Sequence, residues 1–134
     1  MSTRGMLPQP GRARDNNSDW PYWISGQVTL AASGGAGLQG AAYPETINVN
    51  DHHFRGAKLM VESTGAFLCL ITINGRSFNS APTHSANMFG TAQLPFELNL
   101  PMNFPKGTVV QIQFYDFSGA ANTLNYSFHG GQYD

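Results

Sequence analysis

The chain has 134 residues, enough for one domain with a continuous core and too few for two ordinary domains. Charged residues make up 11% of it and hydrophobic residues 41%, so its surface is mostly neutral and polar, which suits a subunit packed among others. The formal net charge of −1 excludes a global field that would attract nucleic acid, an anionic membrane or a highly charged substrate.

Residues 1–19 are predicted to form an extended arm, since they contain prolines and glycines and show neither helical nor alternating periodicity. Ordering such a backbone costs on the order of 20 kcal/mol, so we expect a partner surface to hold it. The segment also lacks a hydrophobic core of signal-peptide length, and we expect a soluble protein that is not exported by a cleaved signal. Its candidate partner-binding residues are Arg4, Pro8, Pro10, Arg12 and Arg14.

The segment "DWPYW" places three large aromatic residues, Trp20, Tyr22 and Trp23, at the start of the body. Aromatic side chains bury large areas at low entropic cost and often anchor interfaces. We interpret the three residues as anchors for the arm and for a partner surface. Because such rings also stack on sugars, a carbohydrate-binding site is the alternative interpretation.

The first half of the body is predicted to contain five β-strands, in which apolar and polar residues alternate or form a short apolar run. The run at 67–73 is apolar on both faces at first, which indicates a central strand or one covered by a neighbouring subunit. It ends at Asn74-Gly75, the strongest short hairpin signal. The predicted strands are 22–31, 45–51, 57–63, 67–73 and 76–80.

Three further strands are predicted in the second half. Asp116, Ser118 and Asn122 lie where the alternation breaks, and we interpret them as turn residues that bond backbone amides, not as a catalytic or binding site. The last strand is expected to end at Gly130-Gly131. In chain order, the predicted segments are a connection at 81–93, a strand at 94–100, a turn at 101–107 and strands at 110–115 and 122–129.

Eight strands with one apolar face each must bury those faces in a sandwich or a barrel. The short turns and the longer links predict an all-β fold, an eight-stranded jelly-roll sandwich of two four-stranded sheets, with residues 20–134 as a single domain behind the extended N-terminal arm. An immunoglobulin-like sandwich is the alternative, although the cysteine pair around a core tryptophan is absent.

Residues for catalysis or metal binding do not occur in a distinctive pattern. The adjacent His52 and His53 would point to opposite faces of a regular strand, so they are not expected to share a metal ion. Cys69 is the only cysteine, which excludes an internal disulfide and argues strongly against a Cys-based zinc site. Because a nucleophile elbow and a phosphate-binding loop are also absent, we expect a protein that is not an enzyme, with no catalytic residues, cofactor or metal.

Three features of the chain occur together: the arm with Pro and Arg, the low-charge body rich in Asn, Gly and Thr, and the C-terminal layout "FPKGTVVQIQFYDFSGAANTLNYSFHGG". In these features the chain resembles the small single jelly-roll structural proteins of tailed bacteriophage particles. Such proteins decorate or cement the capsid, occupy its vertices or serve as tail and fibre components, and several form trimers. Because fold does not fix function, the resemblance assigns no functional residue.

The resemblance implies a structural virion protein, a capsid decoration, cement or minor capsid subunit. It would self-associate, with a trimer favoured, and contact the major capsid protein or other virion proteins after assembly in the host cytoplasm. No membrane and no specific nucleic acid is expected as a partner. The alternative is a carbohydrate-binding module or a receptor-binding tail or fibre component that uses Trp20, Tyr22 and Trp23.

Overall fold

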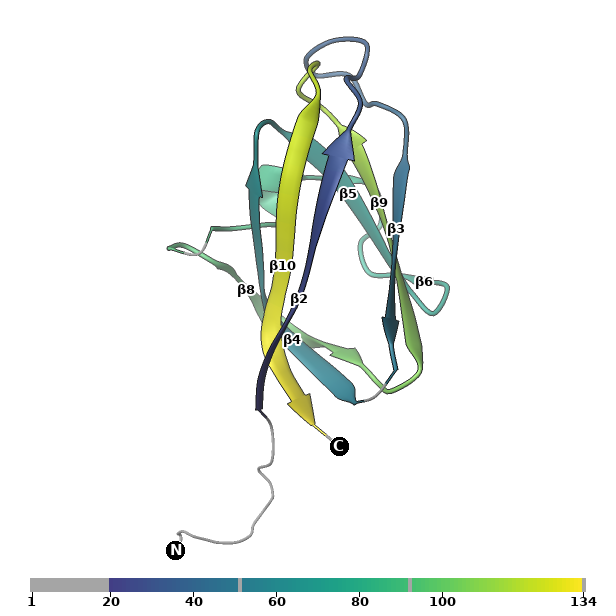
Figure 1. Cartoon of the computed structure of the whole chain (residues 1–134), viewed down its shortest axis with the longest axis vertical. Coiled ribbons are helices and arrows are strands. Elements are labelled where there is room, and N and C mark those ends of the chain that lie inside the picture. Colours follow the sequence, from purple (N-terminus) through teal and green to yellow (C-terminus); the bar gives the residue numbers. More distant parts are fainter. Residues whose placement is uncertain (1–19, 51, 92, 134) are drawn as a thin grey trace, which may run out of the picture.

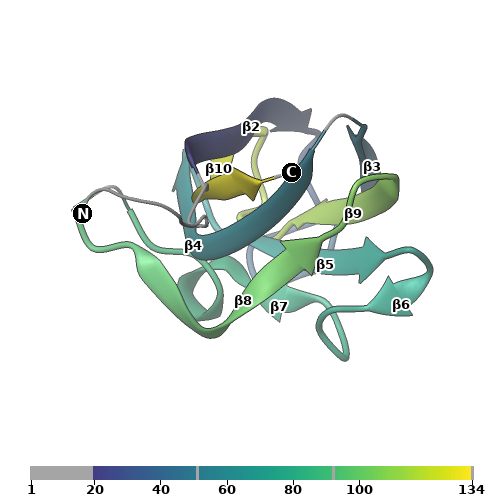
Figure 2. The same ribbon diagram turned by 90° about the horizontal axis from the view of Figure 1, so that it is seen from below.

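The computed structural model describes residues 20–50, 52–91 and 93–133, and these ranges form two antiparallel β-sheets packed as a sandwich. Figures 1 and 2 show the two layers from the side and from below. The described residues contain a single 3-10 turn, η1 (Ser85–Asn87), and no α-helix. None of their helical segments is long and apolar enough to cross a membrane.

The two sheets differ in size. One has four strands in the order β2-β10-β4-β8, and the other has five, with the order β3-β9-β5-β6 and with β7 paired to β5. The strands of the first sheet are β2 (Trp20–Leu30), β10 (Asn122–Tyr133), β4 (His53–Ser63) and β8 (Phe96–Phe104). Those of the second are β3 (Tyr43–Val49), β9 (Thr108–Asp116), β5 (Phe67–Ile73), β6 (Arg76–Ser77) and β7 (Thr83–His84).

The described strands therefore number nine, not the eight that were predicted. The predicted strand at 76–80 pairs with β5 only over Arg76 and Ser77, and β7 lies inside the predicted connection. The side chain of Asn79 explains the interruption. Its Oδ1 accepts from the amide of Ile71 at 2.9 Å and its Nδ2 donates to the carbonyl of Cys69 at 2.8 Å, so a side-chain amide replaces part of the backbone ladder.

The core lies between the sheets and consists of the inward residues of each alternation. The predicted inward faces of the last two strands are confirmed, and Ile112, Phe114, Leu124 and Phe128 are fully buried. Each such side chain contributes about 1.5–3 kcal/mol on burial. The hairpin at Asn74-Gly75 is also confirmed, since both residues have positive φ, 49° and 81°.

The prediction ended two strands several residues too early. β8 continues through Pro101 to Phe104, and the turn lies at residues 105–107. Pro101 makes no pair with β4, so its missing amide costs no ladder hydrogen bond at this sheet edge.

The second error concerns β10, which continues through Gly130-Gly131 to Tyr133. A β-bulge lies between His129 and Gly130, and a Cβ on Gly130 would collide with the backbone of Arg55. The glycines thus permit a close approach of β10 to β4 instead of ending the strand.

Candidate functional site

Asp116 is the centre of a buried polar cluster at the end of the sandwich where the loops meet. Its Oδ2 accepts from the amides of Ser33 at 2.9 Å and Gly119 at 3.0 Å, and its Oδ1 accepts from the Ser118 hydroxyl at 2.6 Å and amide at 3.1 Å. Asn122 Nδ2 donates to the same Oδ1 at 3.2 Å. The predicted turn role of these side chains is confirmed, and it extends to Ser33, a residue distant in sequence.

Electrostatics favour the charged form of this carboxylate. Burial by itself raises the pKa of Asp116, but the hydrogen bonds from Ser118, Ser33 and Asn122 outweigh burial and hold the pKa well below its usual range. Asn122 is fully buried, and it also accepts from the amide of Gly65 at 3.1 Å. The cluster joins three loops, and its polar atoms are engaged within the protein.

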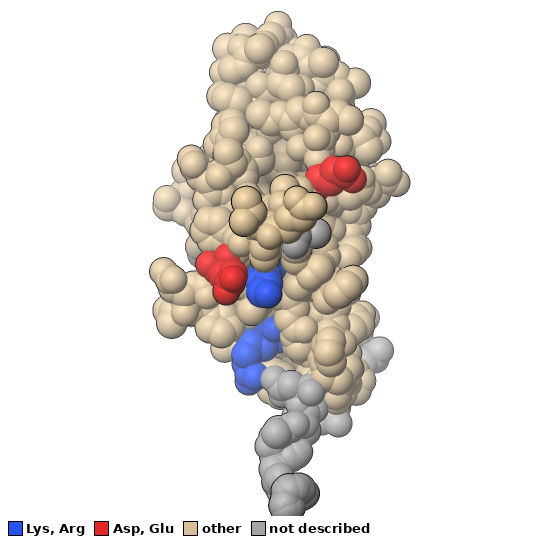
Figure 3. All heavy atoms as spheres, turned by 90° about the vertical axis from the view of Figure 1, so that its left-hand side faces the viewer, with Lys and Arg blue, Asp and Glu red and all other residues tan. Residues whose placement is uncertain are grey.

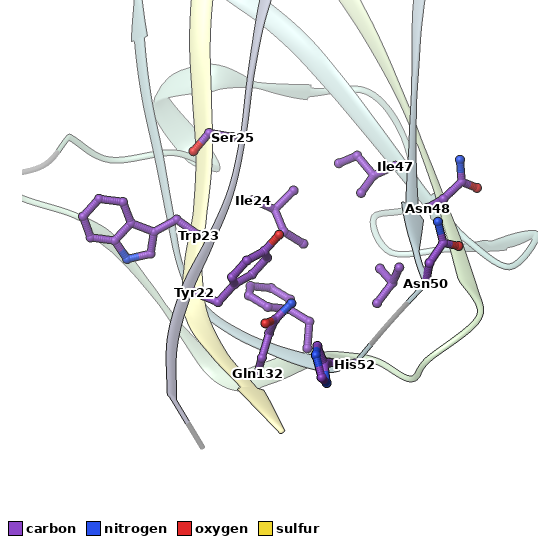
Figure 4. Close-up of a pocket in the computed structure, with 11 residues that line it drawn as sticks. Tyr22, Trp23, Ile24, Ser25, Ile47, Asn48, Asn50, His52 and Gln132 are labelled. Carbon is purple, nitrogen blue, oxygen red and sulfur yellow. The ribbon is translucent and has the colours of Figure 1, made fainter. Parts of the chain in front are cut away.

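A cleft of about 530 Å³ lies on the open side of the sandwich, between the edge strand β2 of one sheet and the edge strand β3 of the other. Figure 4 shows Tyr22 directed into this cleft from β2, with Gln132 and His52 beside it and Asn48 and Asn50 on the β3 side. Its described lining residues are Tyr22, Trp23, Ile24, Ser25, Ile47, Asn48, Val49, Asn50, His52, Phe54 and Gln132, and none of these is an acid, lysine or arginine.

The aromatic residues of the cleft are held by specific contacts. The ring of Tyr22 meets the buried ring of Phe54 edge-on, with centroids 6.2 Å apart. Trp20 donates from Nε1 to Gln132 Oε1 at 3.0 Å and meets the ring of His52 edge-on at 5.0 Å. One hydrogen bond and two ring contacts at this end of the cleft therefore link β2, β10 and the start of β4.

The three predicted anchor residues do not form one surface. Trp20 and Tyr22 contact residues at the cleft, whereas Trp23 points away from it (Figure 4) and stacks on His129, with ring centroids 4.2 Å apart and planes 3° apart. Burial and the positive charge of Lys58 lower the pKa of His129, which favours a neutral imidazole under the indole. The predicted partner-binding residues Arg4, Pro8, Pro10, Arg12 and Arg14 lie outside the described residues.

The adjacent histidines at the start of β4, His52 and His53, contact different residues. His52 contacts Trp20, whereas Nδ1 of His53 accepts from the amide of Lys106 at 2.9 Å and its ring stacks on Tyr133. Among the described residues, no group of three or more His, Cys, Asp or Glu side chains is arranged to hold a metal ion.

The outer faces of the two sheets differ in charge. The outward positions of β4 and β8 include Lys58, Glu62 and Glu97, and Figure 3 shows a few acidic and basic side chains on the side where β8 lies. The outward positions of β3, β5 and β9 carry no charged side chain. They are Pro44, Thr46, Asn48, Leu68, Leu70, Thr72, Val109, Gln111, Gln113 and Tyr115, which we call the neutral face.

Exposed apolar side chains lie along the edge strand β8 and just before it. Leu94, just before the strand, is 80% exposed, and Leu100 within it is 82% exposed. Phe96 is 39% exposed. Exposed apolar residues along an unpaired strand edge are a ready-made contact for another chain.

Sequence reasoning identified Tyr22 but missed the polar residues of the cleft. Asn50 stands at the end of a predicted strand and carries no signal beyond that of a turn residue. Gln132 lay beyond the predicted end of the last strand, and its partner Trp20 is near the opposite end of the chain. The parity of positions 20, 22 and 23 could have shown that Trp23 faces away from the other two rings.

Comparisons with known proteins add little to this description. No family model and no curated protein matches the chain. Among solved structures, dimeric latent PorU from Porphyromonas gingivalis aligns with 84% of this chain and 13% of its own chain, at 12% identity and a TM-score of 0.30. This chain thus spans a small part of that protein, and a likeness this weak supports no statement about fold or function.

Proposed function

We propose that the chain is a structural virion protein, a capsid decoration, cement or minor capsid subunit that stabilises the particle through self-association. The observation that carries this proposal is the neutral face, which covers three adjacent strands without one charged side chain. Contacts between copies desolvate such a face without burying unpaired charges. Closed symmetry is the usual result of self-association in soluble proteins. A trimer is proposed because several of the phage jelly-roll proteins that the chain resembles form trimers.

The strand order supports a jelly-roll fold for this subunit. If β7 is left out and the other strands are named B to I in chain order, β6 is strand F. The two sheets then have the strand orders B-I-D-G and C-H-E-F. Jelly rolls of two Greek keys are common in capsid proteins. We propose that β7 is an addition to this plan, made possible by the Asn79 side chain.

The arm and the exposed apolar edge have separate roles in the proposal. Residues 1–19 lie along the shell, and the β8 edge with Leu94 and Leu100 contacts the major capsid protein or another virion protein. Many copies on a symmetric lattice make individually weak contacts strong through effective concentration.

The test is the presence of the chain in mature particles of the virus that encodes it. Quantitative mass spectrometry of purified particles should find it in many copies, and antibody labelling in electron micrographs should place it on the particle surface. Its absence from purified particles would contradict the proposal.

A further inference from the structure

We propose that the cleft between β2 and β3 binds a neutral oligosaccharide. None of the lining residues that the structure describes is an acid, lysine or arginine, which favours an uncharged ligand over a phosphate, carboxylate or ammonium group. Its volume of about 530 Å³ falls within the range of ligand sites in proteins, roughly 300–1,000 Å³. The ligand class then follows from the uncharged groups that line it.

Tyr22 supplies a stacking surface. Its side chain is 42% exposed, yet its ring is held against Phe54, which is 1% exposed and part of the core. Figure 4 shows the ring directed into the cleft. An aromatic ring that is exposed but fixed offers a large contact area at low entropic cost, and the C–H face of a pyranose is its natural partner.

A polar side chain lies beside this ring. Gln132 Oε1 accepts from Trp20 Nε1, which fixes the amide so that its NH₂ group is the end left for other partners. Asn48 and Asn50 border the cleft on the β3 side, but their side chains are directed away from Tyr22 (Figure 4), so the amide beside the ring is that of Gln132. A side-chain amide carries a donor and an acceptor next to each other, and this pattern matches the vicinal hydroxyls of a sugar.

A purely apolar ligand fits the cleft less well. It would cover the amide of Gln132 without replacing the hydrogen bonds of that amide to water, and this loss costs about 1–3 kcal/mol. A peptide strand added to the open edge of β2 would bind mainly through backbone groups. Such binding would not require the Tyr22 ring, so the two occupants are distinguishable.

The experiment uses the full-length chain on an array of neutral and acidic oligosaccharides, followed by calorimetric titration with the neutral oligosaccharide that binds most tightly. Tyr22→Ala should weaken that binding roughly tenfold or more, and Tyr22→Phe should retain most of it because the ring remains. Tyr43→Ala is the matched control, because Tyr43 is 41% exposed on β3 and is not among the lining residues of the cleft. Trp23→Ala tests the outer face of the four-stranded sheet, where the indole stacks on His129. Gln132→Ala, which removes the amide beside the ring, provides a second measurement should Tyr22→Ala not fold.

Binding that is lost in Tyr22→Ala and Gln132→Ala, and kept in Tyr43→Ala, supports the proposal. It is overturned if no neutral oligosaccharide binds or if only acidic ones do. Loss of binding in Trp23→Ala alone also overturns it, because the site would then lie on the outer face of the four-stranded sheet.

Discussion

At the scale of single residues, Asp116 determines how the loops are held. Its carboxylate accepts hydrogen bonds from three segments and is 1% exposed. Asp116→Asn keeps the shape of the side chain but replaces an acceptor oxygen with a donor amide, so it should lower the free energy of unfolding by about 2 kcal/mol or more. Urea unfolding at neutral pH measures the change, and Glu62→Gln on the exposed face of β4 is the control.

The same residue predicts how stability depends on pH. Because the pKa of Asp116 is lower in the folded state than its unfolded value of about 3.9, its contribution is present above that value and is lost as the pH falls toward the folded pKa. Urea midpoints measured from pH 6 to pH 3 should decrease, and they should decrease less steeply in Asp116→Asn. Equal slopes in the two proteins would show that another group controls acid unfolding.

Gly26 is a second residue whose identity is set by packing. It lies opposite Tyr126 in the β2–β10 pair, and an added Cβ would stand 2.5 Å from Tyr126 Oη. That hydroxyl donates to Glu45 Oε2 at 3.0 Å, so the ring cannot move without losing the bond. Gly26→Ala should destabilise the fold by about 1–3 kcal/mol.

Gly34→Ala is the matched control for this change, because the nearest heavy atom to its added Cβ is 4.0 Å away. The midpoints of thermal unfolding compare the two variants. Equal midpoints for Gly26→Ala and Gly34→Ala would contradict the prediction. They would show that the Tyr126 ring can move away from an added methyl group despite its hydrogen bond to Glu45.

At the scale of elements, Asn79 decides where the five-stranded sheet ends. Its side chain bonds Ile71, Cys69 and Thr83, so it holds the irregular segment between β6 and β7 against β5. Asn79→Ala should cost about 1–3 kcal/mol, because a buried backbone amide loses its acceptor. Hydrogen exchange should also quicken at the amide of Ile71, whereas Asn125→Ala on the exposed face of β10 should leave it unchanged.

The elements also show which structural features a sequence can predict. Strand 67–73 and the Asn74-Gly75 hairpin depend on local alternation and on local turn geometry, and both were predicted correctly. Pro101 and Gly130 were interpreted as strand ends, since local propensity is all that a sequence displays. Both residues lie within strands because of their surroundings in the fold. Pro101 lies at an unpaired sheet edge, and Gly130 lies against the backbone of Arg55.

The candidate site illustrates the same limit. The sequence shows three aromatic residues close together at 20–23. Because successive strand residues point to opposite faces, Tyr22 lies in the cleft and Trp23 lies on an outer face. The cleft itself is formed by the edges of two different sheets, which meet only in three dimensions. Its polar residues, such as Gln132, could therefore not be predicted from their local sequence.

At the scale of the whole molecule, the distribution of charge distinguishes the two outer faces. Isolated charges occur on the four-stranded sheet, and the neutral face of the other sheet has none. A protein with few charges gains little protection from association through repulsion. We therefore propose that the neutral face is the surface that joins copies of the chain.

Sedimentation equilibrium of the full-length chain tests this claim most directly. The unmodified protein should sediment as an oligomer, and Gln111→Lys in the middle of the neutral face should weaken association by roughly tenfold or more, since it buries an unpaired charge. Gln27→Lys makes the same change at an exposed position of β2 and should leave the oligomer intact. A monomer at all concentrations, or equal association of the two variants, would contradict the account.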